Sequence, residues 1–221
     1  RTLHTVKPSK QELTNYNAVH ASWIDEWNHH QEAHTMPKGF VLNMLTDLRH
    51  ECGKMKATSA VDYIKEYRNI TGKPLVVFAH HKDVLKSIHG GLIDDKDHRW
   101  RMGIIAGGVN AEARQQRVEA FQAGQLDVML CSTVAAKEGI TLTEADTVLF
   151  VEREWVPAWE EQAEDRVYRI GQDSDSVQAV YLTVAGTIDE KFDAVVEAKR
   201  AVVKAVLDGG EMDERKGIAS A

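Results

Sequence analysis

The sequence predicts an α/β protein in which a parallel sheet carries helices on both faces, preceded by a helical N-terminal segment. From Pro74 onward, short apolar runs alternate with segments of helical spacing. The runs are continuous and rich in β-forming residues, which is typical of strands buried on both faces of a parallel sheet. Residues 1–73 show helical spacing throughout. Repeated β-α units imply a parallel sheet covered by helices on both sides.

The composition is ordinary for a soluble globular protein. Of the 221 residues, 43% are hydrophobic and 28% are charged, so the chain can bury a sizeable core. No apolar run approaches the length of a membrane span, and Cys52 and Cys131 are too few for a disulfide framework. We therefore expect no membrane partner and a reducing compartment, which is the cytoplasm in a bacterium or phage-infected cell and the nucleus in a eukaryote. Because the chain begins at Arg1 rather than Met, we expect a piece of a longer protein.

The net charge of −7 argues against a strongly basic nucleic-acid-binding module. Phosphate binding needs clustered lysine and arginine, so a nucleic-acid site would have to be a local basic patch. The overall charge does not exclude such a patch, but it predicts weak binding by this chain alone.

Three helices are expected in residues 1–73. Ser9 and Glu12 form a capping-box pattern that opens the first, and Gly72 with Pro74 ends the third. Their apolar stripes are Tyr16, Val19, Trp23 and Trp27; Phe40, Met44, Leu45 and Leu48; and Val61, Ile64 and Tyr67. The aromatic residues could stack on bases, but packing on the body of the protein is the favoured interpretation. His29, His30 and His34 lack further ligands of matching spacing, so they are interpreted as surface histidines and no metal site is predicted.

Strands and helices alternate in residues 74–210, which we expect to form one lobe followed by a polar tail, residues 211–221. Gly90 and Gly91 are expected to end the first helix of this lobe. The predicted strands are Leu75–Ala79, Met102–Ala106, Val128–Cys131, Thr147–Val151 and Val177–Val184, and the predicted helices are Asp83–His89, Ala111–Ala123, Ala158–Ile170 and Ile188–Leu207.

The helix predicted over Ala158–Ile170 has two distinct faces. Gln162, Arg166 and Arg169 lie at i, i+4 and i+7, while apolar residues repeat the same spacing one position on. Two planar guanidinium groups on one face suit phosphate oxygens and the charge that develops in phosphoryl transfer. The spacing alone also fits an ordinary solvated face. Gly171 is placed to end the helix in a left-handed conformation.

Several ordered motifs resemble those of Snf2-type superfamily 2 ATPases. QAEDRVYRIGQ (residues 162–172) resembles motif VI of that family, and STVAAKEGITLTEADTVLF (132–150) resembles the motif V region. VVFAHHKDVLKSI (76–88), GGVNAEARQQRVEAF (107–121) and GTIDEKFDAVVEAK (186–199) resemble further family segments. The residue pattern of the motif V and motif VI segments is similar to that of the annealing-helicase-like subgroup. The resemblance implies the second RecA-like lobe, or helicase C-terminal domain, of a DNA-dependent ATPase.

For the nucleotide, the resemblance implies that Arg166 and Arg169 act as arginine fingers and that Gln162 and Gly139 line the same cleft. ATP and Mg²⁺ would be held mainly by an N-terminal RecA-like lobe of the same protein. This chain contains no G-x-x-x-x-G-K-[ST] loop and no D-E-x-H motif after a buried strand. We therefore expect negligible ATP hydrolysis by this chain alone.

For DNA, most simply double-stranded, the resemblance implies a surface across both lobes. Ser132 and Thr133 follow a buried strand, where ligands of open parallel sheets gather, and they are candidate phosphate contacts. His80, His81 and Lys82 occupy the comparable position after the first predicted strand. Helix capping remains an alternative for the two hydroxyl residues, and a surface turn remains one for the histidines.

Three other functions remain open at this point. A strand-separating helicase of the same superfamily would need a wedge element, and none is evident. A catalytically idle lobe that binds DNA or protein is possible, although the intact Gln162, Arg166 and Arg169 pattern argues against it. A Rossmann-like small-molecule enzyme would need a glycine fingerprint after the first strand, where this chain has Ala79, His80 and His81.

Overall fold

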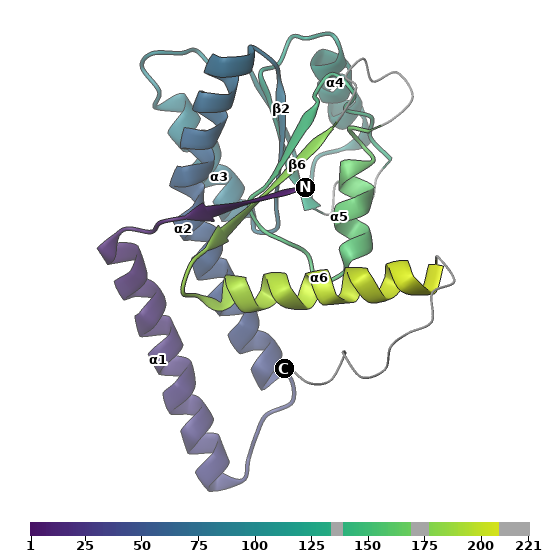
Figure 1. The fold of residues 1–221 in the computed structure, drawn as a ribbon. Coiled ribbons are helices and arrows are strands. Elements are labelled where there is room, and N and C mark those ends of the chain that lie inside the picture. Colours follow the sequence, from purple (N-terminus) through teal and green to yellow (C-terminus); the bar gives the residue numbers. More distant parts are fainter. Residues whose placement is uncertain (134–138, 169–176, 208–221) are drawn as a thin grey trace.

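The computed structural model describes residues 1–133, 139–168 and 177–207, and it contains one six-stranded sheet (Figure 1). The order is β1-β6-β5-β2-β4-β3, and every neighbouring pair is parallel, which confirms the predicted fold class. The strands are β1 (Thr2–Val6), β2 (Leu75–Ala79), β3 (Met102–Ile105), β4 (Val128–Ser132), β5 (Thr147–Phe150) and β6 (Gln178–Val184). The helices are α1 (Lys10–Ala33), α2 (Phe40–Thr71), α3 (Lys82–Ile93), α4 (Ala111–Gln122), α5 (Pro157–Glu164) and α6 (Ile188–Leu207).

Helices cover both faces of the sheet because successive strand residues point to opposite sides. In β2, Val77 faces a core that α2 and α3 complete, whereas Val76 and Phe78 face a core completed by α4 and α5. Helix α6 contacts α2, α5 and β6, and it runs across the end of the sheet at which the strands finish (Figure 1). We call this end the carboxyl edge.

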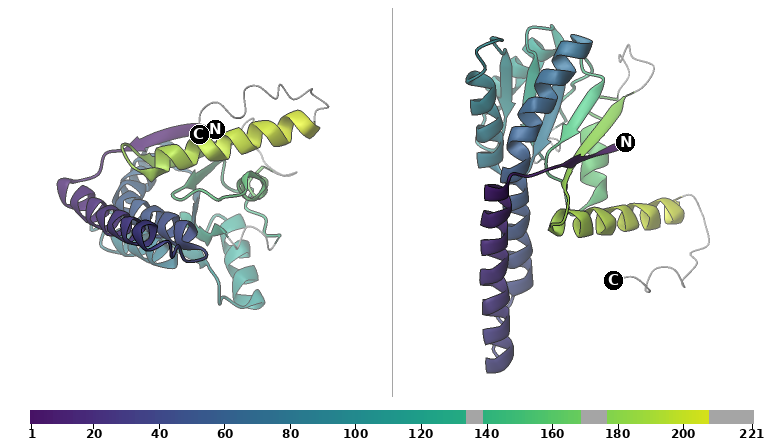
Figure 2. Two further views of the ribbon diagram at one scale, coloured as in Figure 1. Left: turned by 90° about the horizontal axis from the view of Figure 1, so that it is seen from below. Right: turned by 60° about the vertical axis from the view of Figure 1, so that its left-hand side comes forward.

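Helix α1 and the first half of α2 form a hairpin that extends beyond the sheet on the side of the carboxyl edge (Figure 2). The capping box predicted at Ser9 is present: its Oγ accepts from Glu12 N at 3.3 Å, and Glu12 Oε2 accepts from Ser9 N at 2.7 Å. Trp23 and Trp27 pack around Phe40, with ring centroids 5.1 and 6.0 Å apart. The aromatic stripe is thus used to join the two helices. None of the helices among the described residues is both long and apolar enough to span a membrane.

Strand β1 was not expected, because residues 1–73 were predicted to be helical. It pairs with β6 from Thr2↔Val180 to Val6↔Val184. Of its five residues only Val6 is buried, so the segment TLHTV has no continuous apolar run to mark it as a strand. Its conformation is determined by the edge of β6, whose paired residues lie 178 positions away in the sequence.

Several helix boundaries also differ from the prediction. The second and third predicted helices are one continuous helix, α2. The segment between Phe40 and Gly72 contains no proline, and its one glycine, Gly53, lies inside the helix. Gly90 and Gly91 lie inside α3 rather than ending it. A Cβ atom at Gly91 would lie 2.9 Å from Val61 Cγ2, so this glycine permits close packing of α3 on α2.

The arginine-bearing helix is shorter than predicted. Helix α5 ends at Glu164, and the N–H groups of Arg166 and Val167 donate three residues back, at 3.2 and 3.0 Å, as in a tightened last turn. The proposed cap at Gly171 lies outside the described residues, as does Arg169.

Candidate functional site

The carboxyl edge brings together the five residues predicted to contact nucleic acid. Ala79 lies opposite Ser132 in the β2–β4 register, so His80 and Thr133 follow side by side. His81 is the residue before α3, and Lys82 is the first residue of that helix. Segments 50 or more residues apart in the sequence therefore contribute to one surface.

Glu152, two residues beyond β5, fixes the start of α3. Its Oε2 accepts from the backbone N–H groups of His80 and His81, both at 2.9 Å, and its Oε1 lies 2.6 Å from His81 Nδ1. The side chain is only 2% exposed. Burial alone would raise the pKa of Glu152, but the bonds from His81 outweigh it, and the pKa lies below its ordinary value. A carboxylate at a helix N-terminus also complements the helix dipole.

A second buried carboxylate holds the neighbouring histidine. Glu154 Oε1 lies 2.8 Å from His80 Nδ1. The bond to Glu154 raises the pKa of His80 despite partial burial. Burial would raise the pKa of Glu154, but the bond from His80 and the nearby Arg49 charge lower it instead. Both partners therefore favour an imidazolium–carboxylate pair.

A third pair extends this row of histidines onto α2. His50 Nε2 lies 2.6 Å from Asp83 Oδ2, and the His50 ring stacks on His81 with centroids 4.1 Å apart. Helix α2 also supplies Gly53, where a Cβ atom would lie only 2.5 Å from Glu152 Oε1. Close approach of α2 to the carboxyl edge thus depends on a glycine.

The five predicted residues differ in their access to solvent. His80 and Lys82 are exposed, and His81 is half-buried. Lys82 Nζ donates to Gly107 O at 3.1 Å, which holds the lysine beside the end of β3. Ser132 and Thr133 are each 4% exposed, and Ser132 Oγ has no hydrogen-bond partner within the described part of the chain. Of the five predicted residues, His80 and Lys82 are therefore the charged groups that a phosphate could reach.

The residues predicted to face the nucleotide lie elsewhere. Gln162 is exposed on α5, and Arg166 is half-buried just after the helix ends. Arg166 O accepts from Leu142 N at 2.8 Å, so the segment that follows Gly139 is tied to the arginine segment. Gly139 is exposed and has a φ of +73°, which favours glycine. Helix α5 begins near the carboxyl edge and its 8 residues span roughly 12 Å at 1.5 Å per residue, with Gln162 in its second half and Arg166 just beyond its end.

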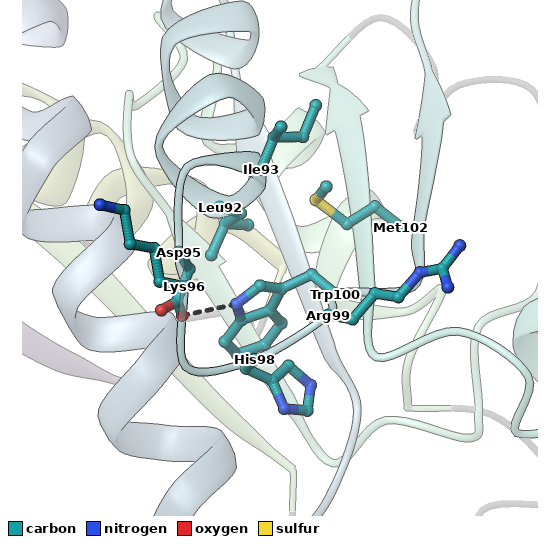
Figure 3. Close-up of a pocket in the computed structure, with 8 residues that line it drawn as sticks. All are labelled: Leu92, Ile93, Asp95, Lys96, His98, Arg99, Trp100 and Met102. Carbon is teal, nitrogen blue, oxygen red and sulfur yellow. Dashed lines mark hydrogen bonds between the residues drawn. The ribbon is translucent and has the colours of Figure 1, made fainter.

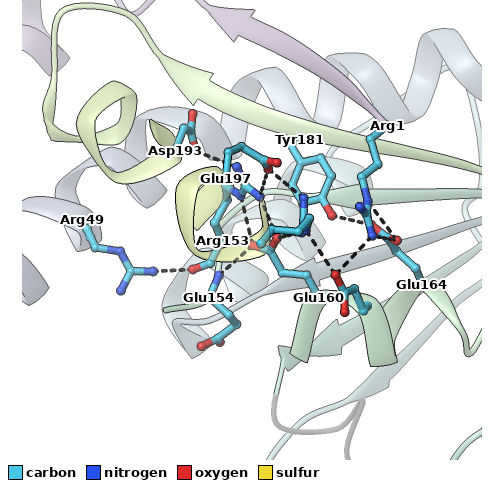
Figure 4. A network of polar contacts seen from close by, with 11 residues as sticks. Arg1, Arg49, Arg153, Glu154, Glu160, Glu164, Tyr181, Asp193 and Glu197 are labelled. Carbon is cyan, nitrogen blue, oxygen red and sulfur yellow. Dashed lines mark hydrogen bonds and ion pairs between the residues drawn. The ribbon is translucent and has the colours of Figure 1, made fainter. Parts of the chain in front are cut away.

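Buried ion pairs connect the end of β5 to α5 and α6 (Figure 4). Arg153 donates to both carboxylate oxygens of Glu160, at 3.0 and 2.7 Å, and to Glu197 Oε1 at 2.6 Å. Arg200 donates to Glu160 Oε2 at 2.7 Å, and Arg49 donates to the backbone oxygen of Arg153. Burial would lower the pKa of Arg153, but the bonds to Glu160 and Glu197 outweigh it and raise the pKa.

The sequence interpretation missed Glu152, Arg153, Glu154 and Glu160. A signal for two of them was present, because Glu152 and Glu154 follow a predicted buried strand just as His80 and His81 do. Carboxyl ends of parallel strands meet at one edge, so acid–histidine pairing could have been inferred if β5 had been placed beside β2. The sequence does not reveal that strand order.

A pocket of about 340 Å³ lies around the loop between α3 and β3 (Figure 3). Trp100 Nε1 donates to Asp95 Oδ2 at 2.8 Å and closes the loop. The lining residues include none of those predicted to bind DNA or nucleotide. This pocket is therefore separate from both candidate surfaces.

Comparison with known proteins identifies the class to which this fold belongs. Residues 56–171 match the family described as the helicase conserved C-terminal domain. The mouse (Mus musculus) protein "DNA annealing helicase and endonuclease ZRANB3" is 35% identical over 170 residues, which are 76% of this chain and 16% of that protein. "SWI/SNF-related matrix-associated actin-dependent regulator of chromatin subfamily A-like protein 1" of Xenopus tropicalis is 38% identical over 149 residues, 67% of this chain and 15% of that protein. The chain thus spans about a sixth of these relatives.

Solved structures show the same fold. The "Sulfolobus solfataricus SWI2/SNF2 ATPase core domain" superposes with a TM-score of 0.72 and 22% identity, covering 93% of this chain and 44% of that one. The isolated C-terminal domain of that ATPase superposes with a TM-score of 0.70 and 18% identity over 93% of this chain and 88% of that one.

These findings define a RecA-like helicase C-terminal domain. The chain belongs to the helicase conserved C-terminal domain family, and it is the C-terminal lobe of a Snf2-type protein, as its motifs predicted.

Proposed function

We propose that this chain is the second ATPase lobe of an ATP-dependent DNA translocase or helicase. The observation that carries the proposal is that residues 56–171, the segment matching the helicase C-terminal domain, contain both candidate surfaces. The carboxyl edge, with His80 and Lys82 exposed, would contact DNA phosphates. The surface beyond α5, with Gln162 and Arg166, would face the nucleotide. A Sulfolobus solfataricus SWI2/SNF2 core of the same fold was solved with dsDNA, which supports duplex DNA as the partner.

The nucleotide would be bound between this lobe and an N-terminal lobe of the same protein. Bound Mg²⁺ would neutralise charge on the ATP phosphates. Among the described residues, no group of three or more acidic, histidine or cysteine side chains is arranged to hold a metal ion, so the proposal assigns Mg²⁺ mainly to the other lobe. This chain would contribute Gln162 and Gly139 to nucleotide positioning, and Arg166 and Arg169 to the charge that develops on the γ-phosphate.

The sequence relatives reported above are eukaryotic proteins, and one is named as a regulator of chromatin. Their origin favours the nucleus over the bacterial or phage cytoplasm for this protein.

The test is DNA-stimulated ATP hydrolysis by the full-length protein, with Arg166→Ala and Arg169→Ala compared with wild type. We expect each variant to lose roughly 10³-fold or more in turnover, as for arginine fingers elsewhere, while still binding ATP and duplex DNA. Arg99→Ala is the matched control, because Arg99 is an exposed arginine beside the separate pocket. Turnover at the wild-type rate in both variants would show that the arginines are structural.

Two further comparisons separate the alternatives. Stimulation by duplex rather than forked or single-stranded DNA indicates a translocase, whereas strand separation indicates a helicase. Wild-type protein that binds DNA without hydrolysing ATP would be an idle binding lobe. The isolated 221-residue chain is expected to release no phosphate from ATP above background, and measurable turnover by this chain would contradict the division of labour between the two lobes.

A further inference from the structure

Three consecutive charged residues are buried at the carboxyl edge. Glu152, Arg153 and Glu154 are 2%, 4% and 3% exposed. Burying charges is unfavourable unless each is paired, and apolar side chains often pack there at no loss of stability. The buried run therefore calls for an explanation other than stability.

The contacts of this run lie on two sides, with Glu152 and Glu154 against one set of partners and Arg153 against another. Glu152 and Glu154 bind the histidines that precede α3, on the candidate DNA surface. Arg153 points the other way, to Glu160 in α5 and Glu197 in α6 (Figure 4). One short segment thus contacts both the DNA side and the helix that leads to the arginine surface.

Glu160 strengthens the connection on the α5 side. Its carboxylate accepts from Nε and Nη2 of Arg153, and its Oε1 also accepts from the backbone N–H of Glu154 at 3.0 Å. Glu160 is 1% exposed and lies two residues before Gln162. A bidentate arginine–carboxylate pair fixes orientation as well as distance, so a shift of the 152–154 segment is transmitted to α5 rather than absorbed.

We propose that the Arg153–Glu160 pair is a positioning link that makes the arrangement of α5 depend on occupation of the carboxyl edge by DNA. This inference rests on the proposed function, because it takes the carboxyl edge as the DNA surface. DNA phosphate drawn to His80 and Lys82 displaces the His80–Glu154 contact, and Arg153 conveys that displacement to Glu160 and so to Gln162 and Arg166. Neither Arg153 nor Glu160 touches DNA or nucleotide.

The test uses the 221-residue chain, at 24.7 kDa, and follows backbone amide signals by NMR while a 20-base-pair duplex is added. In wild type we expect the signals of His80 to Lys82 to shift together with those of Gln162 and Ala163. In Glu160→Gln the edge signals should shift as in wild type, with Kd within twofold, while the α5 signals shift by less than half as much. Glu161→Gln is the matched control: it removes the adjacent, more exposed carboxylate that has no bond to Arg153.

Arg153→Lys provides a second variant that keeps the charge but loses the two-pronged contact, and it should uncouple α5 in the same way. A purely structural role would alter both sets of signals or neither. Equal α5 shifts in wild type and in both variants, or no α5 shift in wild type, would overturn the link while leaving the DNA surface in place. Absence of any DNA-dependent shift at His80 to Lys82 would overturn the proposed DNA surface and the link with it.

Discussion

Glu152 holds more of the candidate DNA surface in place than any of the residues predicted to form it. It caps the backbone of His80 and His81, pairs with the His81 ring, and lies against Gly53 of α2. At the scale of single residues, the geometry of this surface therefore depends on buried groups behind it. Substitutions there change the surface without altering any exposed side chain.

Gly53→Ala tests that dependence. The added methyl group would lie 2.5 Å from Glu152 Oε1 and 3.1 Å from Val84 Cγ2, so one of these must move. We expect a loss of about 1–3 kcal/mol in the free energy of unfolding, as for other overpacked sites. Gly90→Ala is the control, because a Cβ atom there meets nothing within 4 Å and alanine favours helix, so it should gain up to about 1 kcal/mol. Urea unfolding of the two variants measures both, and equal effects would contradict the role of Gly53.

The His80–Glu154 pair predicts a dependence of stability on pH. The pKa of His80 is raised above its ordinary 6.5, so its stabilisation is complete below pH 6.5 and is lost as the pH rises through the raised value. The pKa of Glu154 is lowered, so its stabilisation is complete above pH 4.5 and is lost as the pH falls through the lowered value.

Comparison of wild type with His80→Gln at pH 6 and pH 9 tests this prediction. The variant should be less stable at pH 6, by less than about 1 kcal/mol because the imidazole is partly exposed, and the difference should vanish by pH 9. Duplex DNA binding should weaken over the same rise in pH as the imidazolium is lost. A stability difference that is equal at both pH values would show that His80 is not charged at pH 6.

At the scale of helices and strands, the sequence predicted the elements whose own residues determine them. The strands β2, β4 and β5 are continuous apolar runs. They were placed correctly because a strand buried on both faces has apolar residues at nearly every position. Strand β1 and the end of α5 were wrong because contacts from distant segments decide them. Strand β1 depends on the edge of β6, and the segment after α5 is bonded to Leu142.

Deletion of residues 1–6 tests the contribution of β1. The deletion removes the hydrogen bonds between β1 and β6 and exposes an edge of the sheet. We expect a loss of about 1–3 kcal/mol in the free energy of unfolding, since each bond contributes about 0.5–1.5 kcal/mol and ordering of the strand offsets part of that. Hydrogen exchange should become faster at amides of β6 and remain unchanged in β3. Unchanged exchange in β6 would mean that β1 is not stably paired.

At the scale of the whole molecule, the net charge of −7 opposes binding of DNA, and the exposed cationic candidates at the carboxyl edge are His80 and Lys82. Binding of duplex DNA by this chain should be weak, with Kd of roughly 10⁻⁴–10⁻⁶ M, and log K should fall with log salt concentration with a slope of about −2 to −3 for two or three phosphate contacts. Lys82→Ala should reduce the slope by about 1. Lys96→Ala, at the separate pocket, should leave it unchanged. Fluorescence anisotropy between 50 and 200 mM salt provides the measurement, and a slope that is the same in Lys82→Ala as in wild type would remove Lys82 from the surface.

The candidate site was predicted from the sequence only in part. Motifs and strand ends indicated His80, Lys82, Ser132 and Thr133, because polar residues directly after a buried strand can be recognised in the sequence. The carboxylates behind them were not indicated, because their partners depend on the strand order β5-β2-β4, which follows from packing of the whole chain. The arginine surface remains a prediction that rests on motif VI, and Arg169 lies outside the described residues.

The pairing of β1 with β6 has a consequence for biosynthesis. Thr2 pairs with Val180, so the strand made first waits for a partner made 178 residues later. At roughly 5–20 residues per second, the ribosome leaves that strand without its partner for about 9–36 s. Its threonines and histidine make it a poor template for sticking to other nascent chains in that interval, since exposed apolar edge strands are the ones that aggregate. The weak apolar character of β1 is the reason that sequence analysis did not predict the strand. The same property reduces its tendency to aggregate before β6 is made.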